Sequence, residues 1–160
     1  MPKSWPFADG EFGVAVCRFA FHHFEHPEQV LAQMCRVSGP GATIAIEDLY
    51  ASEFQPRASC YNHFERLRDR SHTRALAPTE LITMAAGAGI ELQRLYSDEV
   101  VVEMEAWLQS AQRSADDAAE VRRLPEDDRR RDLSGARPFL RDGKIMFHQR
   151  TIALIGRKLG

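Results

Sequence analysis

A chain of 160 residues, 44% of them hydrophobic and 28% charged, has the size and composition of one globular domain. Its 21 basic and 23 acidic residues give a formal net charge of -2, so no overall positive field attracts nucleic acid. Apolar runs all fall short of the ~20 residues that span a bilayer, and no apolar signal segment opens the chain, so we predict a cytoplasmic protein without membrane insertion.

The first predicted elements form a strand–helix–strand unit. Residues 12–20 make a nearly continuous apolar run, which is typical of a strand covered on both faces. Pro27 opens a helix over 27–37, and Gly39-Pro40-Gly41 ends it. A second apolar strand over 43–49 ends in two carboxylates. A strand–helix–strand unit of this length predicts a parallel pair of strands.

The remaining pattern predicts three helices and further strands. The helices cover 61–68, a segment from Pro78 to Gly87 or Gly89, and a stripe of Met104, Trp107 and Leu108 that we assign to the core. The strands cover 90–96, which 100–102 extends or follows as a separate strand, and a closing β segment over 144–148 and 151–156.

Residues 113–137 are highly charged and predict a solvated helix or loop. The basic run Arg129-Arg130-Arg131 is not assigned to nucleic-acid binding, because acidic residues flank it closely on both sides. The three cysteines, Cys17, Cys35 and Cys60, lack CxxC spacing, which favours buried thiols over a disulfide framework or a zinc site. We predict no metal site.

Five motifs carry a family resemblance. They are Trp5-Pro6-Phe7-Ala8-Asp9-Gly10-Glu11-Phe12, Val16-Cys17-Arg18-Phe19-Ala20-Phe21-His22-His23-Phe24, Met34-Cys35-Arg36-Val37, Gly39-Pro40-Gly41 and Ile46-Glu47-Asp48. In this order and spacing they resemble class I S-adenosylmethionine-dependent methyltransferases, in particular the ubiquinone/menaquinone-biosynthesis-like branch.

The resemblance implies an α/β, partial Rossmann-like methyltransferase fold. Residues 12–20 and 43–49 correspond to the family's fourth and fifth strands, the later β segments to its antiparallel sixth and seventh, with helices on both faces of the sheet. The family's first three strands, with the glycine-rich cofactor loop, precede the equivalent of Trp5, and no GxGxG occurs in this sequence. We therefore expect residues 1–160 to form a single, truncated methyltransferase-like domain.

The same resemblance implies the cofactor and the site. It places Cys17, Arg18 and Phe19 beside S-adenosylmethionine and His22 or His23 near the substrate, as a general base. For the two histidines, a helix-start pair bonded to backbone and a metal-binding pair remain open alternatives.

Four further residues are candidates for substrate binding: Asp48, Tyr50, Tyr61 and His72. Asp48 alternatively caps the next turn, the tyrosines alternatively fill the core, and His72 alternatively lies in a solvated loop. Ligands of open α/β sheets bind beyond the carboxyl ends of the strands, where 17–23 and 47–50 lie.

The function implied is methyl transfer from S-adenosylmethionine to a small quinone-like or phenolic acceptor. The alternative is a catalytically incomplete homologue that acts as a dimerising or partner-binding module. Without the family's first strand, residues 12–20 form an exposed apolar sheet edge. We expect this edge to pair in a homodimer or with a separate chain that completes the sheet.

Overall fold

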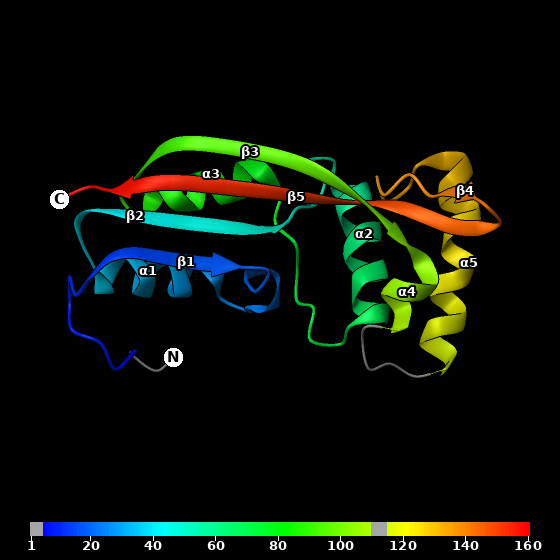
Figure 1. Ribbon diagram of the computed structural model, residues 1–160, viewed down its shortest axis with the longest axis horizontal. Helices are drawn as coiled ribbons and strands as arrows, with labels where there is room; N and C mark the ends of the chain where they lie inside the picture. The colour runs from blue at the N-terminus through cyan, green and yellow to red at the C-terminus, as the bar shows by residue number, and fades with distance from the viewer. Residues whose placement is uncertain (1–4, 110–114) are drawn as a thin grey trace.

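The computed structural model describes residues 5–109 and 115–160 and has a mixed α/β architecture (Figure 1). In chain order the elements are β1 (Phe12–Arg18), the short 3-10 helix η1 (Phe21–His23), α1 (Pro27–Val37), β2 (Ser38–Leu49), α2 (Gln55–Arg68), α3 (Pro78–Gly87), β3 (Ile90–Glu103), α4 (Met104–Gln109), α5 (Ala115–Arg131), β4 (Phe139–Arg141) and β5 (Lys144–Lys158). Residues 113 and 114, at the start of the charged segment, lie outside the described residues. Within those residues, no helix combines the length and the apolar character that crossing a membrane requires.

The predicted strand–helix–strand unit is confirmed. Strands β1 and β2 are parallel, with Cys17 paired to Ile46, and α1 makes the crossover between them. Pro27 occupies the first turn of α1, where its missing N–H costs no hydrogen bond, and the buried Leu31 and Met34 face the sheet. Strand β2 begins at Ser38, earlier than the predicted strand over 43–49, so Gly39, Pro40 and Gly41 belong to the start of the strand.

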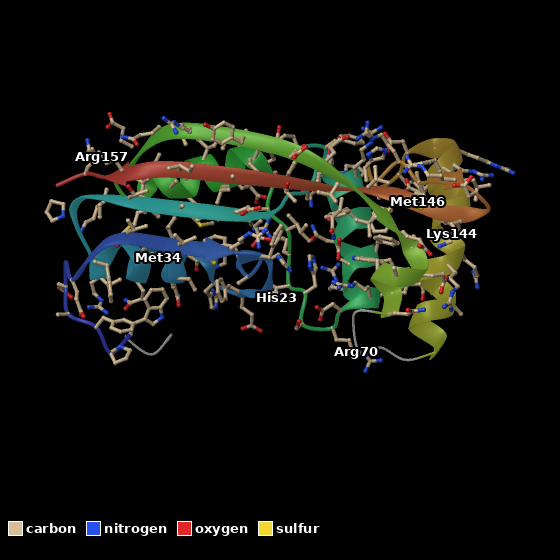
Figure 2. All side chains as sticks on the ribbon, in the orientation of Figure 1. His23, Met34, Arg70, Lys144, Met146 and Arg157 are labelled. Atoms are coloured by element: carbon tan, nitrogen blue, oxygen red, sulfur yellow. The ribbon has the colours of Figure 1, made fainter. Side chains whose placement is uncertain are left out.

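Strand β5 lies at the centre of the sheet, whose order is β1-β2-β5-β3, with β4 paired to β5 (Figure 1). It runs antiparallel to β2 and to β3, as expected for the later strands. The two closing segments expected from the sequence are one continuous strand, because Gln149 and Arg150 pair with Val100 and Glu99 across the supposed break. The same ladder makes 90–96 and 100–102 one strand. In Figure 2, Lys144 and Arg157 mark the opposite ends of β5.

Helices α1 and α3 pack on the same face of the four-stranded part. Ile44, Ile46 and Leu154 on that face share a buried core with residues of both helices. On the opposite face, Val14 and Val16 of β1 are 58% and 64% exposed. No described helix packs over that part of the opposite face, which differs from the expected helices on both faces. The reason is that both crossovers, through α1 and α3, return on one side of the sheet.

A second core lies at the far end of β5, where α2, α4 and α5 gather (Figure 1). The predicted core role of Met104, Trp107 and Leu108 is confirmed, since all three are buried here. The rings of Phe64 and Trp107 stack with centroids 4.7 Å apart, and Phe147 of β5 meets both rings edge-on. Aromatic packing of this kind anchors the helices to the extended part of the sheet.

Among the described strands, β1 pairs only with β2 and so forms one edge of the sheet. The edge position expected for residues 12–20 is therefore confirmed for this part of the chain. Backbone groups on the outer side of an edge strand are available to a further strand.

Candidate functional site

The carboxyl ends of the parallel strands β1 and β2 meet η1 near the middle of the molecule. The chain turns sharply after β1 at Phe19, whose φ of 47° is unusual for a residue with a side chain. The Phe19 N–H donates to the Glu47 carbonyl at 2.8 Å, which ties this turn to β2. The turn directs η1 across the end of β2, towards α2. Figure 2 shows His23 in this turn, on the side that faces α2.

Asp48, near the end of β2, organises η1 through its carboxylate. One oxygen, Oδ2, accepts the backbone N–H groups of Phe21 at 2.5 Å and His22 at 3.2 Å. The other, Oδ1, accepts the N–H of Leu49 at 2.6 Å and contacts Nδ1 of His22. Asp48 is only 4% exposed, so a buried carboxylate is compensated by four donors.

The contact with Asp48 fixes the orientation of the His22 ring. An ionised carboxylate only accepts hydrogen bonds, so Nδ1 of His22 carries the proton that lies between them. In the neutral tautomer with its proton on Nδ1, the lone pair is on Nε2. A histidine oriented in this way by a carboxylate has the arrangement of a general base.

His23 contacts the loop between α2 and α3. Its Nδ1 lies 3.0 Å from both the carbonyl oxygen and the hydroxyl oxygen of Ser71. The carbonyl of His22 accepts the N–H groups of Thr73 and Arg74, which docks the same loop. The two histidines therefore have different partners: the His22 ring contacts the carboxylate of Asp48, whereas the His23 ring contacts Ser71.

His72 lies in the same loop, but its side chain is buried, not solvated. Its ring centroid is 5.3 Å from that of His22, and its Nε2 lies 2.7 Å from Oδ1 of Asn62. Burial first, and then the neighbouring His22, lowers the pKa of His72 to about 3. The ring is therefore neutral at pH 7 and donates from Nε2 to the amide oxygen of Asn62.

Tyr61 and Tyr50 occupy two different environments. Tyr61 is 1% exposed, and burial together with the nearby Glu65 carboxyl raises the pKa of its hydroxyl well above the usual value. Glu65 is also buried, which raises its own pKa, and it accepts from Nε2 of Gln149 at 3.2 Å. Tyr50 is half-buried, with the Arg150 guanidinium 4.9 Å from its ring centre.

The three residues assigned to the cofactor point in different directions. Cys17 packs against the core, and burial followed by the charge of Asp48 raises the pKa of its thiol to about 11. Arg18 pairs with Glu47 at 2.7 Å and lies 4.6 Å over the ring of Phe19, which is 37% exposed. Of the three, Arg18 and Phe19 thus offer the most accessible side-chain surface, whereas Cys17 is partly buried.

The structure therefore brings Asp48, His22, His23 and His72 together. Tyr61 is buried in an apolar cluster with Leu49 and Ala75, and Tyr50 packs against the core that α1 and α3 share. A cavity beside His22 and Asp48 holds about 10 Å³, roughly the space of one water molecule. Across the described ranges 5–109 and 115–160, no group of three or more His, Cys, Asp or Glu side chains is placed to hold a metal ion.

Sequence reasoning missed Asn62, which fixes the His72 side chain of this cluster. Its Oδ1 accepts from His72 and from Ala75 N, and its Nδ2 donates to the carbonyls of Ala58 and Ala75. The signal was present in the pattern of α2. Position 62 falls one helical turn after Ala58, on the buried face, where a polar residue requires partners.

Comparison with known proteins gives a consistent picture. A family profile described as "Methyltransferase domain" matches residues 2–46. Two curated relatives are YafE of Escherichia coli K12, 28% identical over 106 residues, and the methyltransferase YcgJ of Bacillus subtilis 168, 28% identical over 114 residues. The matches cover 66% and 71% of this chain but 51% and 45% of those proteins. The chain thus spans about half the length of the curated relatives it matches.

Two solved structures are similar over 98% of this chain, each with a TM-score of 0.89. One is a putative methyltransferase from Bacillus halodurans, 26% identical and covered to 74% of its length. The other is YcgJ from Bacillus subtilis, 25% identical and covered to 68%. In sequence at its start, and in fold throughout, the chain is similar to methyltransferases.

Proposed function

We propose that this chain, with its methyltransferase-like sequence and fold, takes part in methyl transfer from S-adenosylmethionine to a small phenolic or quinone-like acceptor. The observation that carries the proposal is the His22–Asp48 pair at the carboxyl ends of two parallel strands. Ligands of open α/β sheets bind at that end.

The chemistry assigned to His22 is proton removal. As an oxygen nucleophile attacks a methyl group, its hydroxyl proton must leave, and Nε2 of His22 would accept it. Asp48 then stabilises the imidazolium through Nδ1. His72 and His23 support this geometry by holding the neighbouring loop, since Asn62 fixes His72 and Ser71 contacts His23.

Bound S-adenosylmethionine would supply the electrophilic methyl group. The residues described here fit one wall of a site for it: the exposed ring of Phe19 and the guanidinium of Arg18 at the turn after β1. Neither close glycine pair lies at that turn, because Gly39 and Gly41 are at the opposite end of β2, Gly87 is the last residue of α3 and Gly89 follows that helix. The proposal therefore needs further contacts to the cofactor from outside this wall.

The test begins with isothermal titration of the purified chain with S-adenosylmethionine, alongside its mass in solution. Transfer of a labelled methyl group to a panel of phenols and quinols follows, for the wild type and for His22→Gln. Loss of the base is expected to lower the rate by about 10²- to 10⁴-fold. His23→Gln is the matched control and should change the rate only a few-fold. Equal rates for wild type and His22→Gln would contradict the role of His22.

A second candidate function is a dimerising or partner-binding module, favoured by the position of β1. This strand lies at a sheet edge among the described strands, and Val14 and Val16 expose apolar surface beside that edge. We propose that β1 pairs with a second copy or with a separate chain that extends the sheet.

Sedimentation or light scattering tests this candidate. If two copies pair through β1, Val16→Lys brings a lysine of each copy close to the other. The repulsion between these charges should shift a dimer towards monomer. Val100→Lys, on β3 at the other edge, is the control and should leave the mass unchanged. A monodisperse monomer that binds no S-adenosylmethionine and captures no completing chain would contradict both functions, whereas cofactor binding by the chain would favour the enzyme.

A further inference from the structure

A second hollow is lined in part by Asn62, the hydrogen-bond partner of His72 in the histidine cluster. It holds about 420 Å³, which is within the range of small-molecule sites. Its wall comes from α2, from the start of α3 and from the loops before each helix. Its lining residues are Ser52, Glu53, Gln55, Ala58, Ser59, Asn62, Arg66, Arg74, Ala75, Ala77 and Glu80.

Small side chains create the hollow. Ala58, Ala75 and Ala77 are between 1% and 8% exposed, and their small side chains form the apolar floor of the hollow. The amide of Asn62, 5% exposed, completes that floor and is held by its bonds to the backbone of Ala58 and Ala75. The floor therefore combines small apolar side chains with one fixed amide, which suits a flat apolar group.

The acidic residues of the lining are already occupied. Both oxygens of Glu80 accept from Nη1 of Arg74, at 2.7 and 2.8 Å, and one also accepts Ala77 N. Glu53 accepts the N–H and the hydroxyl of Thr79 at the start of α3, at 2.8 and 2.6 Å. Glu80 offsets the charge of Arg74, and Glu53 offsets the positive end of the α3 dipole.

Among the charged residues of the lining, Arg66 has no carboxylate partner among the described residues. Its Nη1 donates to the carbonyl of Thr73 at 3.1 Å, which orients the guanidinium at the rim. No carboxylate of the described residues forms an ion pair with it. A guanidinium held in place by a backbone carbonyl keeps further N–H donors for an anion, and its fork matches carboxylate and phosphate oxygens.

We propose that this hollow binds a small organic anion, with its carboxylate or phosphate on Arg66 and its apolar part on the alanine floor. Ser59, on the same turn of α2 as Asn62, offers a hydroxyl at the rim. The site is distinct from the His22–Asp48 pair and does not depend on the methyl-transfer proposal.

The test is calorimetric titration of the full chain with benzoate, phenyl phosphate and neutral benzamide at millimolar concentrations. Benzoate or phenyl phosphate should bind and benzamide should not, and the stronger of the two anions identifies the preferred head group. Arg66→Gln should weaken anion binding at least about tenfold. Arg94→Gln, an exposed arginine on β3, is the matched control.

Ser59→Trp obstructs the hollow from an exposed position and should also abolish binding, with an unchanged circular dichroism spectrum as the check on folding. His22→Gln should leave benzoate binding unchanged, which separates this site from the proposed catalytic one. The proposal is overturned if neither anion binds, if benzamide binds equally well, or if Arg66→Gln binds like the wild type.

Discussion

The buried imidazole of His22 donates from Nδ1 to the carboxylate of Asp48, a residue 26 positions away on the neighbouring strand. The same carboxylate accepts the backbone N–H groups of Phe21 and His22. The turn after β1 is therefore built on a side chain of β2, and the geometry of His22 depends directly on the register between these two strands.

Replacing this carboxylate is expected to destabilise the fold. Asp48→Asn retains the size but places an NH₂ group where an oxygen accepted hydrogen bonds, so at least one buried donor loses its partner. The expected loss is about 1–3 kcal/mol in the free energy of unfolding, measured by urea denaturation. Asp98→Asn, on the exposed part of β3, should change it by less than about 0.5 kcal/mol. Equal effects of the two substitutions would contradict the role of Asp48.

His72 predicts a specific loss of stability in acid. Its pKa is about 3 in the folded chain against the usual 6.5 of a free histidine, so between these values the unfolded chain binds more protons. Stability from this group is thus complete above about pH 6.5 and falls as the pH falls towards 3.

Between neutral pH and pH 5, His72 lowers the free energy of unfolding by about 2 kcal/mol. His72→Gln keeps a donor for Asn62 but does not titrate, so its unfolding free energy should decline less between pH 7.5 and pH 5. The measurement is urea denaturation at both pH values, with His63→Gln, an exposed histidine, as the control. An unchanged pH slope in His72→Gln would show that His72 protonates normally.

The cysteines are expected to react slowly in the folded protein. Burial raises the pKa of all three thiols, and that of Cys17 to about 11 from 9.0. At pH 8 the thiolate fraction of Cys17 falls about 100-fold, and its reaction with an aromatic disulfide reagent slows accordingly. Three thiols should react rapidly after unfolding in urea. A rapid reaction of Cys17 without urea would contradict the raised pKa of this partly buried thiol.

Gly156 is predicted to be intolerant of any side chain. A Cβ at this position in the central strand β5 would collide with the side chain of Ile90 and come within 2.9 Å of the Glu91 carbonyl oxygen. Gly156→Ala should cost about 1–3 kcal/mol, because the backbone of β3 must shift.

Gly87→Ala is the matched substitution, in a helix where nothing lies within 4 Å of the added methyl group. It should stabilise the chain by up to about 1 kcal/mol. Thermal unfolding followed by circular dichroism compares the two variants. If both variants shift the melting temperature in the same direction, the close packing of β3 against Gly156 is contradicted.

The sequence by itself determined the strand–helix–strand unit at the start of the chain, whereas the predicted helix over 61–68 covers only the second part of α2 (Gln55–Arg68). Pro27, the glycine turn and the apolar spacing place α1 at 27–37, and the continuous apolar runs identify β1 and β2 as parallel strands. These signals are local, because helix starts, chain breaks and face periodicity depend on neighbouring residues. The core role of the Met104, Trp107 and Leu108 stripe was predictable for the same reason.

Only the tertiary structure decided what depends on distant partners. The pairing of Gln149 and Arg150 with β3 makes β5 one strand, although their polar side chains interrupt the local pattern. The contacts of His22 with Asp48 and of His72 with Asn62 join residues whose proximity follows from sheet register and helix docking. Such contacts are fixed by the packing of whole elements. Because an unpaired polar group is costly once it is buried, the packing determines which hydrogen bonds these side chains make.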